Sequence, residues 1–463
     1  MGLPGTSFNP NKDLKEEFVS NLTGSSMVEI FALSTIVPAF TLLRKWNGLK
    51  SAGMQNQNFV GPKGWRQYFF MLALDFLFVV LPPALFFTVL AEWTYICAGC
   101  MMLLLVVIVA LGRILPSRSH YMRTGADSST AIRRLISSYR VSVMIVTCLC
   151  ILGVDFRIFP RRYAKTETYG TSLMDLGVGS FVLANSLVSR QARQGTTLKY
   201  KSSLQAITPL ILLGFARLVF TKGVDYQVHV GEYGVHWNFF FTLAAVSLLT
   251  SIFNIHPRYC GFLGSFILSA YQICLLFGLN EYLTSRERNM NLFSQNKEGI
   301  ISLFGYWGMY LIGVNLGYYL FFGKNSRKAD MNSVQTVQLR VMFFSITFWL
   351  LTMLLDKYVE NVSRRMCNLA YVTLVLAQNF QVLAILMLSD VLRSNLLVLE
   401  GAFDQNLLAA FLLANILTGL INLTIDTLFV SSAMALGVLL LYSMSLTFLV
   451  GCAKFLGMKL KFW

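Results

Sequence analysis

Charge is scarce in this sequence of 463 residues. Only 13% of the residues are charged and 55% are hydrophobic, whereas about 25% of the residues of an average soluble domain are charged. No polar stretch between the apolar runs is longer than a loop. The composition therefore excludes a soluble enzyme and favours one domain that lies in a lipid bilayer.

The short motifs of familiar soluble chemistries are absent as well. The sequence has no Gly-rich phosphate loop, no GxSxG nucleophile elbow and no HExxH pair. The eight cysteines fall mostly inside apolar runs, and even Cys97 and Cys100 lie in the middle of one. We interpret them as small buried hydrophobes, and we expect no metal centre and no bound cofactor.

Long apolar runs dominate what remains. Thirteen segments approach the ~20 residues that cross a bilayer core, and they predict an all-α polytopic integral membrane protein with about 13 transmembrane helices. We expect a polar tail at 1–26, a multi-helix membrane domain at 27–452 and a basic tail at 453–463. The predicted helices are 27–43, 67–90, 93–112, 141–154, 170–189, 204–221, 237–254, 259–279, 299–322, 337–355, 369–389, 405–421 and 430–451.

The basic residues orient these helices. With a lumenal N-terminus and a cytosolic C-terminus, 24 of the 38 Lys and Arg residues fall in cytosolic segments and 13 in lumenal ones, as the positive-inside rule requires. The formal charge of +16 is then a consequence of topology, and the expected partner is the lipid bilayer rather than nucleic acid.

Two further patterns agree with this orientation. The sequons at Asn21, Asn361 and Asn422 all map to the lumenal side, where N-glycosylation occurs. Lys459 and Lys461 have the spacing of a di-lysine signal for retrieval to the endoplasmic reticulum. A plain basic tail that is attracted to anionic lipid is the alternative interpretation.

The densest polar cluster on the lumenal side runs from Asp155 to Gly170. Pro160 interrupts this segment, so the chain can fold back and bring Lys165 near Asp155. A carboxylate beside an ammonium in an apolar pocket can act as an acid–base pair. An interfacial salt bridge that only fixes the loop is the alternative.

Other polar residues lie within or beside predicted helices. Asp175 falls inside a span, where a carboxylate is costly, so it marks either a functional site or a polar packing contact. His236 is a candidate general base, and it precedes Trp237, which suits an interfacial aromatic belt. Arg364 and Arg365 could grip a lipid phosphate, although a solvated loop would also explain them.

Six of these stretches, in this order, resemble the glycosylphosphatidylinositol (GPI) inositol acyltransferase family, called PIG-W in animals. The stretches are EEFVSNLTG at 16–24, DFRIFPRRYAKTETYGTSLMDLGVG at 155–179, EYGVHWNFF at 232–240, KEGI at 297–300, VSRR at 362–365 and NILTGLIN at 415–422. The resemblance extends from the N-terminal tail to the last residues. Arg157 departs from it, because family members carry proline there.

The resemblance implies an enzyme of the endoplasmic reticulum membrane. It would move a fatty acyl group, typically palmitoyl, from acyl-CoA to the inositol 2-hydroxyl of glucosaminyl-phosphatidylinositol. Asp155 and Lys165 are the implied catalytic pair, with Asp155 taking the hydroxyl proton and Lys165 stabilising the oxyanion or positioning the aspartate. The candidate substrate-binding residues are Arg161, Arg162, Asp175, His236, Asn238, Arg364 and Arg365.

Two other functions fit part of the sequence. A membrane O-acyltransferase with another lipid substrate would use His236 as its base. A lipid or solute transporter would line a path with Asp75, Asp175 and Arg217, although the sequence has no internal repeat of the kind common in transporters. The acyltransferase must also bring acyl-CoA, which is made in the cytosol, to a lumenal pocket.

Overall fold

The computed structural model is built almost entirely from helices. It describes residues 12–52, 64–114, 126–194, 200–223, 230–285, 287–322, 331–391 and 396–459. Within these ranges there is no β-strand, only two isolated bridges between residues 24–25 and Thr171. The predicted all-α class is therefore confirmed. The start of the N-terminal tail and Lys461 of the di-lysine pattern lie outside the described residues.

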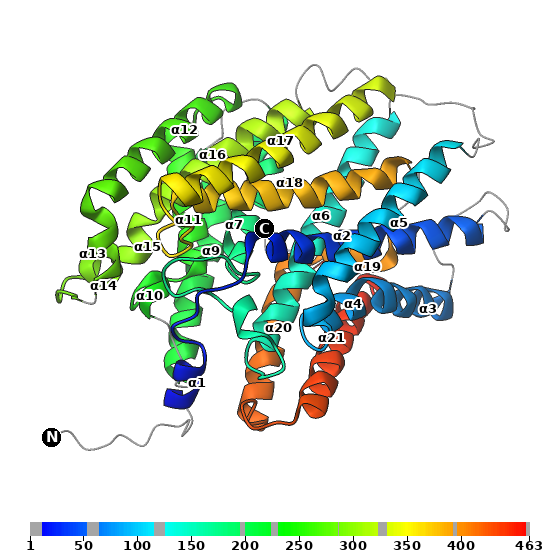
Figure 1. The fold of residues 1–463 in the computed structure, drawn as a ribbon, viewed down its shortest axis with the longest axis horizontal. Coiled ribbons are helices and arrows are strands. Elements are labelled where there is room, and N and C mark those ends of the chain that lie inside the picture. Colours follow the sequence, from blue (N-terminus) through cyan, green and yellow to red (C-terminus); the bar gives the residue numbers. More distant parts are fainter. Residues whose placement is uncertain are drawn as a thin grey trace.

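The main helices lie where the apolar runs predict them (Figure 1). They are α2 (Met27–Ala52), α3 (Trp65–Asp75), α4 (Leu81–Phe86), α5 (Thr94–Ile114), α6 (Ala126–Gly153), α7 (Leu176–Leu187), α9 (Tyr200–Gly223), α11 (Phe239–Phe253), α12 (Pro257–Cys274), α16 (Leu303–Gly317), α17 (Met331–Tyr358), α18 (Leu369–Val391), α20 (Leu407–Thr424) and α21 (Ser432–Phe455). Short helices connect them: α1 (Lys12–Phe18), α8 (Arg190–Gln194), α10 (Val230–Tyr233), α13 (Asn280–Thr284), α14 (Leu292–Gln295), α15 (Lys297–Ile301) and α19 (Val398–Gln405).

In the described part of the chain, ten helices are long and apolar enough to cross a membrane. The other three predicted segments contain shorter helices, namely the twelve residues of α7 and the apolar stretches Ile207–Val219 and Phe239–Phe253. A multi-pass membrane protein is therefore supported, and the count of thirteen spans stays a prediction.

Helix α6 begins well before the predicted residue 141. The predicted segment begins after Arg133, Arg134 and Arg140 because charges are costly in lipid. In the structure these arginines extend the helix, and Arg140 lies 3.4 Å from Asp404. A helix need not end at the bilayer surface, because its polar turns can continue into water.

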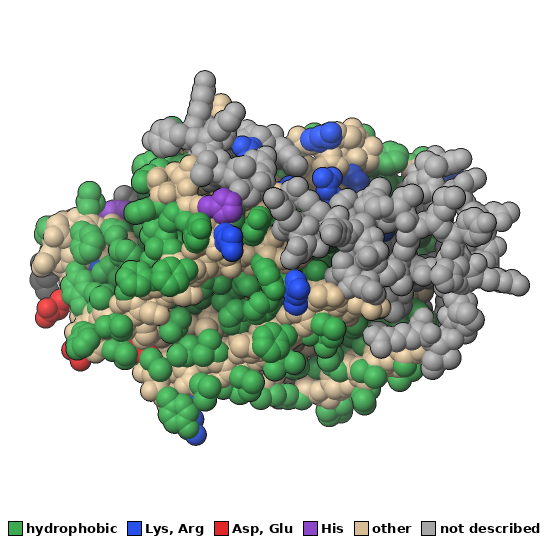
Figure 2. All heavy atoms as spheres, turned by 90° about the horizontal axis from the view of Figure 1, so that it is seen from above, with side chains coloured by type: hydrophobic (Ala, Val, Ile, Leu, Met, Phe, Trp, Pro, Cys, Tyr) green, Lys and Arg blue, Asp and Glu red, His purple; other side chains and the backbone are tan. Residues whose placement is uncertain are grey.

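Helix α18 forms the centre of the bundle and packs against α2, α6, α7 and α17 (Figure 1). Tyr371, Phe380 and Leu386 on α18 are fully buried. The outer helices instead expose large hydrophobic side chains, such as Phe262 on α12 and Phe343 on α17. Figure 2 shows hydrophobic side chains over much of one face, as expected of a surface that faces lipid.

Small residues let α16 approach its neighbours closely. A Cβ atom at Gly317 would collide with the backbone of Leu187 at the end of α7, and one at Gly313 would collide with Ser186. Because attraction between helices in lipid comes from close packing, glycines at such contacts hold the bundle together. Gly437 on α21 has no neighbouring atom within 4 Å of an added Cβ.

Gly317→Ala should therefore destabilise the protein, because backbone atoms of α7 cannot rotate away from the added methyl group. We expect a loss of about 1–3 kcal/mol, as for other overpacked sites, seen as a lower midpoint of thermal unfolding in detergent. Gly437→Ala is the matched control and should leave the midpoint unchanged or slightly higher. Equal midpoints for the two variants would contradict this account of the α7–α16 contact.

Candidate active site

The segment after α6 is folded around the guanidinium of Arg161. Nε and Nη2 of Arg161 donate hydrogen bonds to the carbonyls of Val154, Phe156 and Phe159 at 2.9–3.2 Å. The ring of Phe18 on α1 lies 3.9 Å from the guanidinium carbon. Arg161 thus closes the turn that carries Asp155, and the N-terminal helix covers this arginine.

Asp155 is buried in the turn that directly follows α6, two residues beyond Gly153. Its Oδ2 accepts a hydrogen bond of 2.7 Å from Nδ2 of Asn422 on α20. Its Oδ1 has no hydrogen-bond donor among the described residues. Burial raises the pKa of Asp155 to about 6, although the bond from Asn422 and the charges of Lys15 and Arg161 oppose this shift.

Asp155 differs from every other buried carboxylate that the structure describes. Six Asp and Glu residues are buried, and five of them form ion pairs with Lys or Arg, while Asp155 forms none. The five pairs are Glu29 with Arg162, Asp75 with Arg44, Asp175 with Arg364, Glu298 with Arg288 and Arg365, and Glu400 with Lys45. Because a buried charge without a counter-ion is costly, Asp155 can take up a proton near neutral pH.

Lys165 lies in a separate polar cluster. Its Nζ is 2.9 Å from both carboxylate oxygens of Glu232 on α10, and 39% of its side chain is exposed. Burial alone would raise the pKa of Glu232, but Lys165 and Arg364 lower it to about 2. Glu232 is therefore ionised at physiological pH and holds the Lys165 ammonium at the edge of the protein.

Arg364 joins this cluster to the start of α7. Its Nε lies 2.8 Å from Oδ1 of Asp175, and its Nη1 lies 3.0 Å from Oε1 of Glu232. Asp175 also accepts hydrogen bonds from the backbone amide and the hydroxyl of Thr166. Lys165, Glu232, Arg364 and Asp175 therefore form a chain of alternating charge, which we call the charge network.

The predicted contact between Asp155 and Lys165 is not present. Asp155 is bonded to Asn422, and Lys165 is paired with Glu232. The loop folds back as Pro160 suggests, but the two side chains point to partners on different elements. The sequence could not supply these partners, because Asn422 and Glu232 lie on segments far from the loop in the chain.

Arginines that the sequence predicts to bind substrate already have partners. Arg162 is bonded to Glu29 and Glu92, and Arg365 to Glu298 and the carbonyl of Leu283. These pairs fix loops to helices. One buried nitrogen of each of two arginines, Nη1 of Arg161 and Nε of Arg365, has no hydrogen-bond acceptor among the described residues.

The polar residues around His236 make contacts that are mainly structural. Asn238 caps α11, since its Oδ1 accepts hydrogen bonds from the amides of Phe240 and Phe241. The backbone amides of His236 and Trp237 both donate to Oδ1 of Asn296. The imidazole of His236 is half-buried and makes no hydrogen bond to any described residue.

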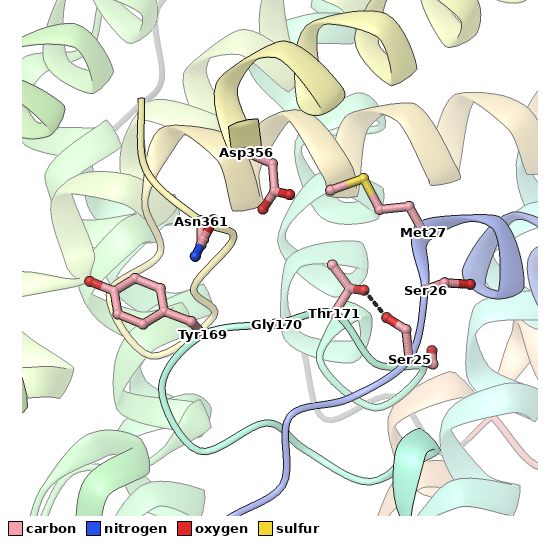
Figure 3. A pocket seen from close by; sticks show the side chains of 8 residues that line it. All are labelled: Ser25, Ser26, Met27, Tyr169, Gly170, Thr171, Asp356 and Asn361. Carbon is pink, nitrogen blue, oxygen red and sulfur yellow. Dashed lines mark hydrogen bonds between the residues drawn. The ribbon is translucent and has the colours of Figure 1, made fainter. Parts of the chain in front are cut away.

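A cavity of about 380 Å³ lies where the N-terminal segment crosses the loop after Asp155 (Figure 3). Thr171 donates a hydrogen bond to the carbonyl of Ser25 at its edge. Tyr169 and Gly170 line it, but His236 does not. The remaining lining residues are Ser25, Ser26, Met27, Thr171, Asp356 and Asn361.

The three sequons differ in their surroundings. Asn21 and Asn361 are exposed, and their side chains make no hydrogen bond to a described residue. Asn422 is half-buried and bonded to Asp155. In the described ranges no group of three His, Cys, Asp or Glu residues could hold a metal ion.

Two residues of this site, Glu232 and Asn422, were not predicted to contact the candidate catalytic pair. In the sequence, Glu232 is only the first residue of the 232–240 stretch, and Asn422 is only a sequon and the last residue of the 415–422 stretch. The role of Asn238 could have been found, because an asparagine directly before an apolar run is a typical helix N-cap.

Comparison with known proteins agrees with these motifs. The GWT1 family model matches residues 11–453. An uncharacterized protein of Arabidopsis thaliana is 52% identical over 90% of this chain and 94% of its own length. The phosphatidylinositol-glycan biosynthesis class W protein of Dictyostelium discoideum is 33% identical over 98% of this chain and 99% of its own length. GPI-anchored wall transfer protein 1 of Emericella nidulans is 35% identical over 94% of this chain and 96% of its own length. The chain therefore belongs to the GWT1 family, the family of the GPI inositol acyltransferases.

Proposed function

We propose that this protein transfers a fatty acyl group, typically palmitoyl, from acyl-CoA to the inositol 2-hydroxyl of glucosaminyl-phosphatidylinositol. The reaction belongs to GPI-anchor synthesis and takes place in the endoplasmic reticulum membrane. Family membership and the names of the relatives support this reaction class. The observation that carries the assignment of the site is the buried, unpaired carboxylate of Asp155.

Asp155 is the general base of this proposal. Its Oδ1 is left to accept the proton of the inositol hydroxyl while the hydroxyl oxygen attacks the thioester carbonyl. Collapse of the tetrahedral intermediate breaks the C–S bond, and the proton passes to the CoA thiolate. An ester and free CoA result, and Asp155 returns to its ionised form.

Arg161 and Lys165 provide positive charge on the two sides of the loop. The unpartnered Nη1 of Arg161 supports a role in binding the phosphate of the inositol lipid. Lys165, held by Glu232 and partly exposed, supports a role in stabilising the oxyanion, provided that the bound substrates bring the thioester within its reach. It does not contact Asp155, so positioning the aspartate is not its role.

The competing functions have less support. A transporter path would need polar groups that are free to meet a solute, yet Asp75 is paired with Arg44 at 2.9 Å and Asp175 with Arg364. A His236 base is compatible with an imidazole that makes no hydrogen bond to a described residue. Asp155→Asn and His236→Ala separate the two candidate bases.

Asp155→Asn should abolish inositol acylation and leave the protein inserted in the membrane, because an amide keeps the shape of the carboxylate but cannot accept the proton. The expected loss is on the order of 10²–10⁴ in rate per enzyme molecule. Transfer of a labelled acyl chain to glucosaminyl-phosphatidylinositol in microsomes measures it, with protein abundance determined in the same membranes.

Lys165→Ala and His236→Ala complete this comparison. Lys165→Ala should also lower the rate per molecule. Near-normal turnover in Asp155→Asn together with a collapse in His236→Ala would move the role of the base to the histidine. A fall in activity that only follows protein abundance in every variant would leave the loop with a structural role.

The rate should also depend on pH in a defined direction. Burial raises the pKa of Asp155 to about 6, and only the ionised carboxylate can accept a proton. Activity should therefore rise with pH through about 6 and fall below it, in permeabilised microsomes that share the pH of the assay. The profile is measured in His236→Ala too, where no histidine base remains and the same acid limb should persist.

We further propose thirteen spans with a lumenal N-terminus, a cytosolic C-terminus and glycans at the exposed Asn21 and Asn361. The ten long apolar helices, together with the shorter apolar helices in α7, α9 and α11, support this arrangement. An epitope tag at the C-terminus should bind antibody when only the plasma membrane is permeabilised, and an N-terminal tag only after the inner membranes are opened. Simultaneous exposure of both tags would require an even number of spans.

A further inference from the structure

Asn422 contacts both a hydroxyl and the Asp155 carboxylate at the end of α20. Its Oδ1 lies 3.4 Å from the hydroxyl of Thr427, which is buried, and its Nδ2 donates to Oδ2 of Asp155 at 2.7 Å. A hydroxyl can donate to the amide oxygen, and a carboxylate accepts only from the amide nitrogen, so the two partners fix the orientation of the amide.

We propose that Asn422 is a positioning residue for Asp155 and not a glycan acceptor. The proposal rests on the proposed function, because it assumes that Asp155 is the base. A hydrogen bond from the amide occupies Oδ2 and fixes the plane of the carboxylate, so that Oδ1 is presented to the inositol hydroxyl. A carboxylate that is free to rotate would meet the hydroxyl in a productive geometry less often.

The neutral amide suits this task better than a cation would. A Lys or Arg in ion-pair contact would hold the proton affinity of the carboxylate low and make it a weak base. Asn422 donates without adding charge. The charged groups that act on Asp155 at longer range are Lys15 from α1 and Arg161 from its own loop, and Tyr442 faces it from α21.

A glycan would be attached to the same Nδ2 atom. In the sequon Asn422–Leu423–Thr424, the acceptor nitrogen lies 2.7 Å from a buried carboxylate. The sequon pattern and the hydrogen bond therefore make opposite predictions for the effect of replacing Thr424. Its side chain is exposed and its hydroxyl is bonded only to carbonyls of its own helix, those of Leu420 and Ile421.

The test compares Thr424→Ala, Asn422→Ala and Asn422→Asp in the full-length protein in microsomes. Thr424→Ala destroys the sequon but keeps the amide, so its rate and its electrophoretic mobility before and after endoglycosidase should match wild type. Asn422→Ala should lower kcat about 10- to 100-fold, as expected for a misplaced catalytic group, with little change in KM for acyl-CoA.

The pH profile separates positioning from a purely structural role. Loss of the amide donor in Asn422→Ala should move the acid limb of the rate profile to higher pH, because that bond favours the ionised carboxylate. Asn422→Asp should move it further, by about one pH unit or more, because two carboxylates in contact share a proton. Only folded enzyme contributes to such a profile, so reduced folding cannot mimic the shift.

Three results would overturn the proposal. One is an endoglycosidase-sensitive shift that is larger in wild type than in Thr424→Ala, by the mass of one glycan. Another is an unchanged kcat in Asn422→Ala, and the third is a reduced kcat with an unmoved acid limb. If Asp155→Asn is active, the base assignment itself fails; if Asp155→Asn is inactive while Asn422→Ala is normal, only the positioning role fails.

Discussion

A charge that leaves water needs a partner, and the polar end of this bundle depends on one buried guanidinium. Arg364 is almost fully buried and bridges Asp175 and Glu232 at 2.8 and 3.0 Å. These carboxylates come from the start of α7 and from α10, and Glu232 in turn holds Lys165. Removing one partner of a buried pair commonly costs about 3–5 kcal/mol, so Arg364 fixes three segments that share no secondary structure.

Asp155 stands apart from this rule, and that is why we propose it as the general base. Among the described residues no cation is in contact with the buried carboxylate, which is bonded to the amide of Asn422. The protein tolerates this cost because the surrounding turn is fixed independently by Arg161 and covered by Phe18. Paired charges build the scaffold, and the unpaired carboxylate is left able to exchange a proton.

The sequence predicts the helices well but not the contacts between polar residues. Apolar length locates a helix whatever its neighbours are, as for α18, and the motif order identifies the family. Lys165 was paired with Asp155 because they are ten residues apart, whereas its partner Glu232 lies 67 residues away. Only tertiary packing brings such groups together. The start of α6 was missed for another reason, since its arginines resemble a loop when hydropathy alone is considered.

The surroundings of Asp155 also suit substrates with long acyl chains. On α20, Ile416, Leu420 and Leu423 are exposed on one helical face, and the spacing of three and four residues places them in a stripe. Asn422 lies beside this stripe and directs its amide inward to the carboxylate. The stripe is thus an apolar surface beside Asp155 along which the acyl chain of the proposed substrate would lie.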